Sequence, residues 1–265
     1  MSKISDSLNH KNIVCPFCSL HCDDLEIDVH DNKLYVKSNV PKSCAYKYEK
    51  LNLPKFKNMV TTVKGKPCEP KKAYQYSRQL IKKSKETVLL NSSSDVNVTR
   101  EVLSAASKVN AIVDHVNSSI FLKNISIYQR RGYMATSLTE IKNKSDVIIV
   151  FSNNLFETYP RLMEKFLATK NSFSVNSKKK EIYVIGNKTS NSRDCNIRDK
   201  RITYVDFNNR NITRLLNSFI SKKNESSIGN QVFNKLLTSI ETSKYLSVLW
   251  ATSEFDSYKE CDEII

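Results

Sequence analysis

Short runs of β-branched and other apolar residues constrain most strongly what this 265-residue chain can fold into. The strongest run is residues 146–151 (DVIIVF). Near-continuous Val and Ile runs of this kind indicate strands that are covered on both faces, as in a parallel sheet. We interpret five further runs in the same way: 87–90 (TVLL), 111–113 (AIV), 181–185 (EIYVI), 202–207 (ITYVDF) and 245–250 (YLSVLW).

The segments between these runs have apolar residues at helical spacing. This periodicity predicts helices at 71–83, 95–108, 160–169, 211–221 and 229–242. Strands that alternate with helices are typical of the α/β class. The sequence therefore predicts an open, mostly parallel α/β sheet as the body of the protein.

The first part of the chain has a different pattern. Residues 25–29 (LEIDV) alternate apolar and polar side chains, residues 30–32 (HDN) favour a turn, and residues 34–36 (LYV) continue the apolar pattern. Two short alternating runs on either side of a turn predict a β-hairpin.

Proline residues mark the expected domain boundary. Pro54, Pro67 and Pro70 punctuate a stretch that has no clear periodicity. We therefore divide the chain into a small hairpin head, residues 1–66, and an α/β body, residues 67–265. The last six residues (ECDEII) resemble the beginning of a helix, so we expect the body to be truncated at its C-terminal end, the alternative being an unusually short protein of its kind.

Four of the seven cysteines cluster in the predicted head. Cys15, Cys18, Cys22 and Cys44 have the spacing C-x2-C-x3-C-x21-C. Three thiolates within eight residues and a distant fourth are the usual arrangement for a cubane iron-sulfur cluster. A structural zinc site would more naturally split into two C-x2-C pairs or use histidines, although His21 between the ligands keeps zinc open. Cys68, Cys195 and Cys261 stand apart, and we interpret them as structural.

Composition narrows the class of protein. No apolar run is long enough for a membrane crossing or a secretory signal, so we expect no membrane association and a cytoplasmic location. In a reducing compartment, thiols act as ligands or buried residues more often than as disulfides. The net charge of +15 is spread over Lys-rich stretches without interleaved aromatic residues, which argues against nucleic-acid binding. An acidic partner protein or an anionic cofactor explains the charge at least as well as nucleic acid does.

The same residues carry a family resemblance. The cysteine segment, followed by Asp23 and Asp24, resembles the cluster-bearing N-terminus of the molybdopterin oxidoreductase superfamily, and the paired aspartates are similar to the B subunit of formylmethanofuran dehydrogenase. Residues 132–146 (GYMATSLTEIKNKSD), the run at 146–151 and residues 159–161 (YPR) are similar to a second stretch of that B subunit. The resemblance implies a formate dehydrogenase-like fold.

The resemblance implies one of two activities. In archaea the B subunit holds a tungsto- or molybdopterin and a 4Fe-4S cluster, and it interconverts carbon dioxide and formate. The bacterial branch is the B subunit of a formyltransferase/hydrolase complex, which works in tetrahydromethanopterin-linked oxidation of formaldehyde to formate. The partners implied there are the amidohydrolase-like A, the glutamate synthase-like C and the formyltransferase D subunits.

The ligand to the pterin metal distinguishes these branches. In this family it is a Cys or selenocysteine, expected here near residues 113–121 (VDHVNSSIF), but no cysteine lies between Cys68 and Cys195. Ile120 cannot replace a thiolate, and Ser118 or Ser119 would supply only an alkoxide. The four glycines of the chain are also few for a site where backbone approaches a pyrophosphate. We therefore expect a 4Fe-4S cluster on the four cysteines and no pterin metal.

The leading hypothesis is a scaffold, the B subunit of a formyltransferase/hydrolase complex, that has lost its own redox catalysis. The alternatives are a zinc-stabilised binding protein and an active tungsten or molybdenum formylmethanofuran dehydrogenase subunit. Three side chains have open roles. Lys47 stands where the family has Gly and is interpreted as a surface residue, the alternative being a contact with the surroundings of the cluster. His115 is interpreted as a polar residue at a strand end, the alternative being a base that faces a vestigial pocket together with Asp114. Arg161 either holds an anion at a helix start or is solvated.

Overall fold

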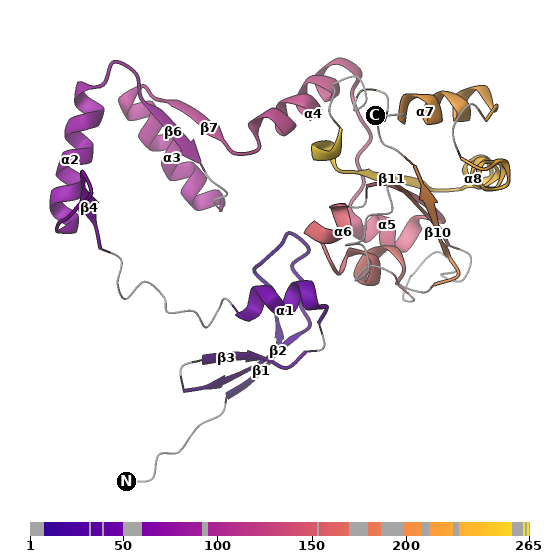
Figure 1. The fold of residues 1–265 in the computed structure, drawn as a ribbon, viewed down its shortest axis with the longest axis horizontal. Coiled ribbons are helices and arrows are strands. Elements are labelled where there is room, and N and C mark those ends of the chain that lie inside the picture. Colours follow the sequence, from indigo (N-terminus) through magenta and orange to yellow (C-terminus); the bar gives the residue numbers. More distant parts are fainter. Residues whose placement is uncertain are drawn as a thin grey trace, which may run out of the picture. The chain divides into compact units, whose positions relative to one another are not determined.

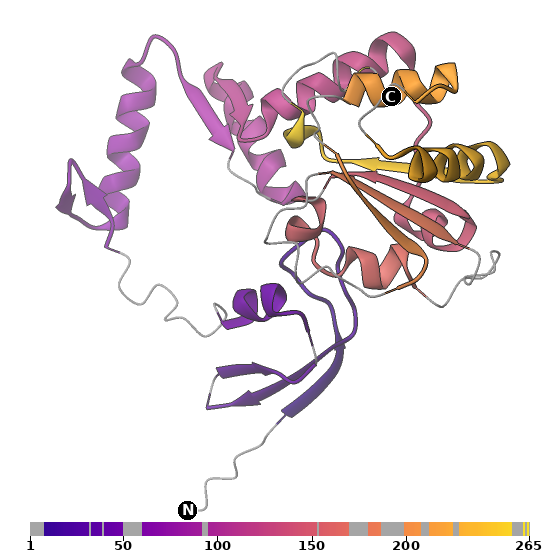
Figure 2. The ribbon, with the colours of Figure 1, turned by 45° about the vertical axis from the view of Figure 1, so that its right-hand side comes forward.

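The computed structural model describes residues 8–31, 33–38, 40–49, 60–91, 95–152, 154–169, 180–186, 199–207, 212–224 and 228–255, together with Asp262 and Ile264. Spatial contacts divide the chain into two compact units (Figures 1 and 2). Unit 1 consists of residues 1–53 and 126–265, and unit 2 consists of residues 54–125. The boundary near residue 66 that the sequence favours stays a prediction.

The N-terminal part of unit 1 is a three-stranded antiparallel sheet followed by a helix. Its strands are β1 (Leu8–Ile13), β2 (Leu25–His30) and β3 (Lys33–Val36), in that order. β2 and β3 form the predicted hairpin, in which Ile27 pairs with Val36. β1 was not predicted, because its sequence LNHKNI has no strong alternation. Helix α1 (Lys42–Glu49) follows. We call residues 8–49 the head.

A four-stranded parallel sheet forms the centre of unit 1. The strands are β8 (Val147–Phe151), β9 (Glu181–Gly186), β10 (Ile202–Asp206) and β11 (Leu246–Trp250), in the order β10-β9-β8-β11. All three pairings are parallel, as the apolar runs predict. Every residue of β8 is buried, so the mixed α/β class with a parallel sheet is confirmed.

Alternate residues of β8 point into two separate cores, because side chains alternate between the faces of a strand. Ile148 and Val150 pack with α5 (Leu138–Lys144), α6 (Asn154–Thr158) and a π-helical turn (Met163–Leu167). Val147, Ile149 and Phe151 pack with α7 (Ile212–Ser221) and α8 (Asn230–Thr242). Both faces of the sheet are therefore covered. A short 3₁₀ turn, Thr252–Glu254, follows β11.

Helix α5 lies within the second stretch that carries the family resemblance. Ser137 caps its N-terminus, because the Ser137 hydroxyl accepts from the Glu140 N–H and the Glu140 carboxylate accepts from the Ser137 N–H. This capping box satisfies two N–H groups that the helix itself leaves unpaired. At the other end, the buried Lys180 ammonium donates to the carbonyls of Ile141 and Lys142.

Unit 2 is built around a two-stranded parallel sheet. β6 (Val88–Asn91) pairs with β7 (Ile112–His115), and helix α3 (Val96–Val109) connects them. Helix α2 (Pro70–Lys83) and the small hairpin of β4 (Thr62–Val63) and β5 (Lys66–Pro67) precede them. Helix α4 (Ser118–Arg131) begins in unit 2 and ends in unit 1. Among the described residues of unit 2, only Ala106 is buried.

The helices differ in part from those that the sequence predicts. Those at 71–83, 95–108, 211–221 and 229–242 form within one or two residues of the predicted ends. The helix predicted at 160–169 contains a π-helical turn, in which the Ala168 N–H donates to the Met163 carbonyl. Helices α1, α4, α5 and α6 were not predicted. The helix start predicted at 260–265 lies largely outside the described residues.

The longest helices, α2, α3 and α4, have 14 residues each. No helix in the described part of the chain is both long and apolar enough to cross a membrane.

Candidate cysteine site

Three of the four predicted ligands lie in one loop between β1 and β2. The Cys15 N–H donates to the Cys22 carbonyl over 2.8 Å, which closes the loop, and the His21 N–H donates to the Cys18 carbonyl over 3.2 Å. His21 adopts a left-handed backbone with φ of 45°, as tight turns require. The local turn therefore brings the backbone of Cys15 and Cys22 together.

Helix α1 supplies the fourth thiol. Cys44 lies in its first turn, where the Cys44 N–H donates to the Pro41 carbonyl. Tyr48 is one turn further along the same face, and its hydroxyl donates to the Cys15 sulfur over 3.2 Å. The Tyr48 ring also contacts Phe17 edge to face. The helix is thus attached to the cysteine loop by one hydrogen bond and one aromatic contact.

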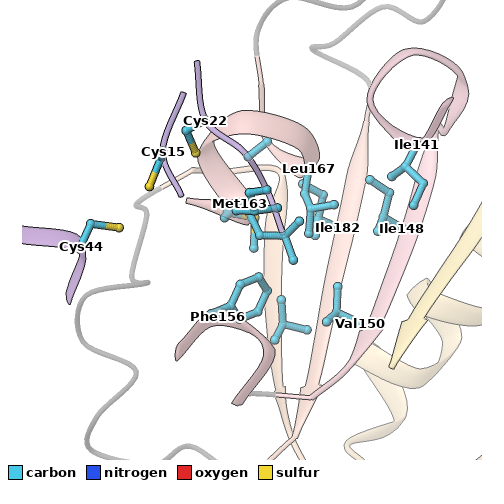
Figure 3. Close-up of a cluster of buried hydrophobic side chains, with 14 of the residues drawn as sticks. Cys15, Cys22, Cys44, Ile141, Ile148, Val150, Phe156, Met163, Leu167 and Ile182 are labelled. Atoms are coloured by element: carbon cyan, nitrogen blue, oxygen red, sulfur yellow. The ribbon is translucent and has the colours of Figure 1, made fainter. Parts of the chain in front are cut away.

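The four thiols fit a soft metal in chemistry but do not form a closed cage. Cys15, Cys22 and Cys44 are buried, Cys18 is half-buried, and all four are free thiols. Figure 3 shows Cys15 and Cys22 on adjacent segments beside Met163, with Cys44 on a neighbouring segment. Among the described residues, no group of three or more His, Cys, Asp or Glu side chains is arranged to hold a metal ion as it stands. Metal binding would have to draw the thiols together.

Burial and nearby positive charges have opposite effects on the pKa of the thiols. Burial raises the pKa of Cys22, while the positive charges of Arg161 and Lys165 oppose the rise. Burial likewise raises the pKa of Cys44, against the positive charge of Lys47. Cys18 raises the pKa of Cys22 further, and the other three thiols raise that of Cys44, since neighbouring thiolates repel one another. A bound cation would reverse this balance, because metals bind thiolates.

A buried arginine joins the cysteine loop to the parallel sheet. Arg161 lies just before the π-helical turn, and its side chain is 6% exposed. Its two Nη atoms donate to the two carboxylate oxygens of Asp24, each over 2.7 Å. Arg161 also donates to Glu164, and the Lys165 ammonium lies 2.5 Å from Asp24. The hydrogen bonds from Arg161 and Lys165 hold the pKa of Asp24 well below its usual range.

The sequence left the role of Arg161 open, and the structure decides it. Arg161 is neither solvated nor aimed at an external anion in this structure; it binds the Asp24 carboxylate of the same chain. Asp24 and Arg161 come from the two segments that carry the family resemblance. Neither partner was predicted to pair, because the two residues are 137 positions apart and no local pattern links them.

The residues expected near a pterin metal lie in unit 2. Asp114 and His115 are the last residues of β7 and are exposed. The Asp114 carboxylate accepts from the His115 N–H over 2.7 Å, which, together with the Ser118 hydroxyl, lowers the pKa of Asp114. The His115 ring contacts Phe121 edge to face. These contacts fit a polar residue at a strand end, as predicted for His115.

The remaining cysteines add no ligand that the structure describes. Cys68 is half-buried in unit 2, and its N–H donates to the Thr61 carbonyl. Cys195 and Cys261 lie outside the described residues. His21 is exposed, although it stands between two buried cysteines. Tyr48 was missed as a neighbour of the site; its spacing of four from Cys44 was the available signal.

Sequence comparison confirms the resemblance. The chain is 26% identical over 162 residues to the B subunit of tungsten-containing formylmethanofuran dehydrogenase 2 of Methanococcus maripaludis, and 27% identical over 167 residues to the B subunit of the enzyme of the same name of Methanocaldococcus jannaschii. Each match covers 59% of this chain and 37% of the relative. The match thus spans well under half the length of these relatives. No family model matches the chain.

Structural comparison supports the fold. A chain in the crystal structure of the formyltransferase/hydrolase complex (FhcABCD) from Methylorubrum extorquens, determined with methylofuran, matches with a TM-score of 0.59 and 16% identity. The match covers 77% of this chain and 55% of that one. At this identity the likeness concerns the fold alone.

Proposed function

We propose, from the similarity to formylmethanofuran dehydrogenase B subunits, that this chain serves as the B subunit of a formyltransferase/hydrolase complex. The complex would act in tetrahydromethanopterin-linked one-carbon oxidation, from formaldehyde to formate. In this role the chain is a cytoplasmic scaffold with the fold type of the molybdopterin oxidoreductases. Its partners are the amidohydrolase-like A, the glutamate synthase-like C and the formyltransferase D subunits.

One observation carries the proposal: the two kinds of comparison converge. The sequence relatives are B subunits of formylmethanofuran dehydrogenases, whereas the solved structure with a similar fold comes from a formyltransferase/hydrolase complex. The segments that carry the resemblance also meet in space, since Asp24 of the first binds Arg161 of the second. A shared ancestor with a family subunit explains both findings.

Two features favour a scaffold over a redox catalyst. The chain has no cysteine between Cys68 and Cys195, so the soft ligand of a pterin metal is missing. Unit 2 exposes many large apolar side chains, including Val88, Leu90 and Ile112, each more than half exposed. Extensive exposed apolar surface is typical of proteins that assemble with partners.

The four cysteines are assigned to a 4Fe-4S cluster within this proposal. Cys15, Cys18, Cys22 and Cys44 would hold it, and a cluster supplies one-electron transfer when it is bound. The hydroxyl of Tyr48 donates to the Cys15 sulfur, and a hydrogen bond to a ligand sulfur favours the more negative thiolate form. Arg161 and Lys165 place positive charge near Cys22, which favours thiolate there as well.

The test is purification of the full chain from cells that also produce the partner subunits, without oxygen. We expect a complex of the four subunit types that releases formate from a formylated pterin, with iron and sulfide but no tungsten or molybdenum. Recovery of the chain without these partners would contradict the proposed role in the complex. Absence of iron from the complex would contradict the cluster assignment alone.

Two alternatives have distinct outcomes in the same experiment. Stoichiometric tungsten or molybdenum, with interconversion of carbon dioxide and formate, would make the chain an active formylmethanofuran dehydrogenase subunit. One zinc per chain without iron would favour a zinc-stabilised binding protein, for which His21 within the cysteine loop is the supporting feature.

A further inference from the structure

We propose that Arg161 is a positioning residue for the cysteine site. By holding Asp24, it links metal capture at the four cysteines to docking of the head on the parallel sheet. The inference rests on the proposed metal site and not on the proposed role in the complex. Asp24 lies two residues after Cys22 and immediately before β2, so a fixed Asp24 also fixes the end of the cysteine loop.

The contact between Arg161 and Asp24 has the geometry of a strong ion pair. Nη1 donates to Asp24 Oδ1 and Nη2 donates to Oδ2, each over 2.7 Å, which restricts orientation as well as distance. The Arg161 side chain is almost fully buried, so it depends on its carboxylate partners for solvation. Lys165 adds a second positive charge at Asp24 Oδ2. The Asp24 side chain therefore has one strongly preferred place.

Arg161 is itself fixed on the sheet. The Lys165 N–H donates to the Arg161 carbonyl over 2.9 Å, and the side chain of Arg201, just before β10, donates to the Ala168 carbonyl. Met163 and Leu167 are buried in the core that contains Ile148 and Ile182 of the central strands. The segment that presents Arg161 is thus held on the sheet by its buried side chains and by the contact of Arg201 at its C-terminal end.

Three of the four thiols are linked to Asp24 through hydrogen bonds and the chain. The Cys15 N–H donates to the carbonyl of Cys22, two residues before Asp24. The Cys15 sulfur accepts from the hydroxyl of Tyr48, on the helix that carries Cys44. Cys15, Cys22 and Cys44 also belong to the same buried core as Met163 and Leu167 (Figure 3). Because the thiols do not form a cage, a metal that binds them must draw them together. The Asp24–Arg161 pair holds the end of the cysteine loop in place while the other thiols move toward the metal.

A neighbouring carboxylate offers a matched control for the Asp24–Arg161 ion pair. Asp23 is adjacent to Asp24, has the same charge and is exposed. Replacing Asp23 removes one negative charge near the site and leaves the Asp24–Arg161 contact in place. Asp24→Asn removes one negative charge and weakens the contact itself.

The experiment is a titration of the reduced, metal-free full chain with Co²⁺, without oxygen. Thiolate coordination of Co²⁺ gives near-ultraviolet charge-transfer bands and visible ligand-field bands that a purely structural change does not produce. We expect Asp24→Asn and Arg161→Met to weaken Co²⁺ binding at least tenfold. Asp23→Asn should stay within about twofold of the parent, since one charge at an exposed site matters little.

A conservative variant guards against misfolding. Asp24→Glu should recover at least half of the affinity that Asp24→Asn loses, because it keeps a carboxylate beside Arg161 and Lys165. Equal Co²⁺ binding by Asp24→Asn and the parent would contradict the positioning role of Arg161 but not the metal site itself. No Co²⁺ binding by the parent would overturn both, while assembly with the partner subunits, measured separately, would still test the proposed function.

Discussion

The two parallel sheets of this protein are built from similar sequences and have opposite surroundings. β8 (VIIVF) is buried at all five positions, whereas the four residues of β7 (IVDH) are all exposed, and β6 (VLLN) alternates exposed with half-buried residues. An apolar run therefore predicts a strand, but it does not by itself predict that the strand is buried. Parallel strands normally have both faces covered, so the sheet of unit 2 is the surface where association would gain most.

The helices around each sheet explain the difference. The sheet of unit 1 has α5, α6 and the π-helical turn on one face and α7 and α8 on the other. The sheet of unit 2 has α3 packed against its two strands. An open hollow of about 750 Å³ lies beside β6 and α3, lined by apolar residues including Leu90, Val98 and Val102.

Equivalent substitutions in the two sheets should differ strongly in how much they destabilise the protein. Ile148→Asp places an unpaired charge at a position with 0% exposure, and it should destabilise unit 1 by about 4 kcal/mol or more. Leu90→Asp, at 63% exposure, should change stability by about 0.5 kcal/mol or less. Urea unfolding followed by far-ultraviolet circular dichroism, to which the helices of both units contribute, measures both. Equal losses would show that the two sheets are equally buried.

Hydrogen exchange tests the same difference without substitution. We expect the β8 and β9 amides to exchange at least about 100-fold more slowly than those of β6 and β7, since buried strands open only with the whole core. Mass spectrometry of the isolated chain measures the rates. Equal protection of both sheets would contradict the comparison. Slower exchange of β6 and β7 after addition of the partner subunits would place the association surface there.

A buried amine distinguishes unit 1 at alkaline pH. Burial, with Arg201 and Lys142 nearby, lowers the pKa of Lys180 to about 8. The unfolded chain, with an ordinary lysine pKa of about 10.4, then binds more protons between these values, so stability from Lys180 rises with pH in that window. Relative to Lys180→Met, the parent should gain about 2 kcal/mol between pH 8 and 10. Urea unfolding at the two pH values measures the gain, and a constant difference would contradict it.

The smallest effect concerns the head. Because the pKa of Asp24 is lowered in the folded chain, its stabilisation is complete above the ordinary Asp pKa of about 3.9 and is lost as pH falls through the lowered value. Asp24→Asn should therefore cost about 1 kcal/mol at pH 7, since Asp24 is partly exposed, and progressively less below pH 4. Thermal unfolding at pH 7 and pH 3 measures this. Asp23→Asn, at an exposed position, is the control for the loss of one negative charge at pH 7.

The local elements were largely predictable because their signals lie within a few residues. The run at 146–151 predicts β8 through its Val and Ile content, and the turn at 30–32 predicts the hairpin of β2 and β3. Helix α5 was not predicted, although Ser137 and Glu140 form a capping box, since its seven residues are too short for clear periodicity. The π-helical turn was predicted only as a helix, because Pro160 and Arg161 do not signal its wider hydrogen bonding.

The sequence alone determined local features of this protein: most of its strands, four of its helices, the spacing of the four cysteines and the similarity to a family of enzyme subunits. Each depends on residues close together in the chain, where spacing directly expresses periodicity or ligand geometry. Only the tertiary structure decided that β8 is buried while β7 is exposed, and that Asp24 binds Arg161. Burial and ion pairing depend on which distant segments meet, and no short stretch of sequence contains that information.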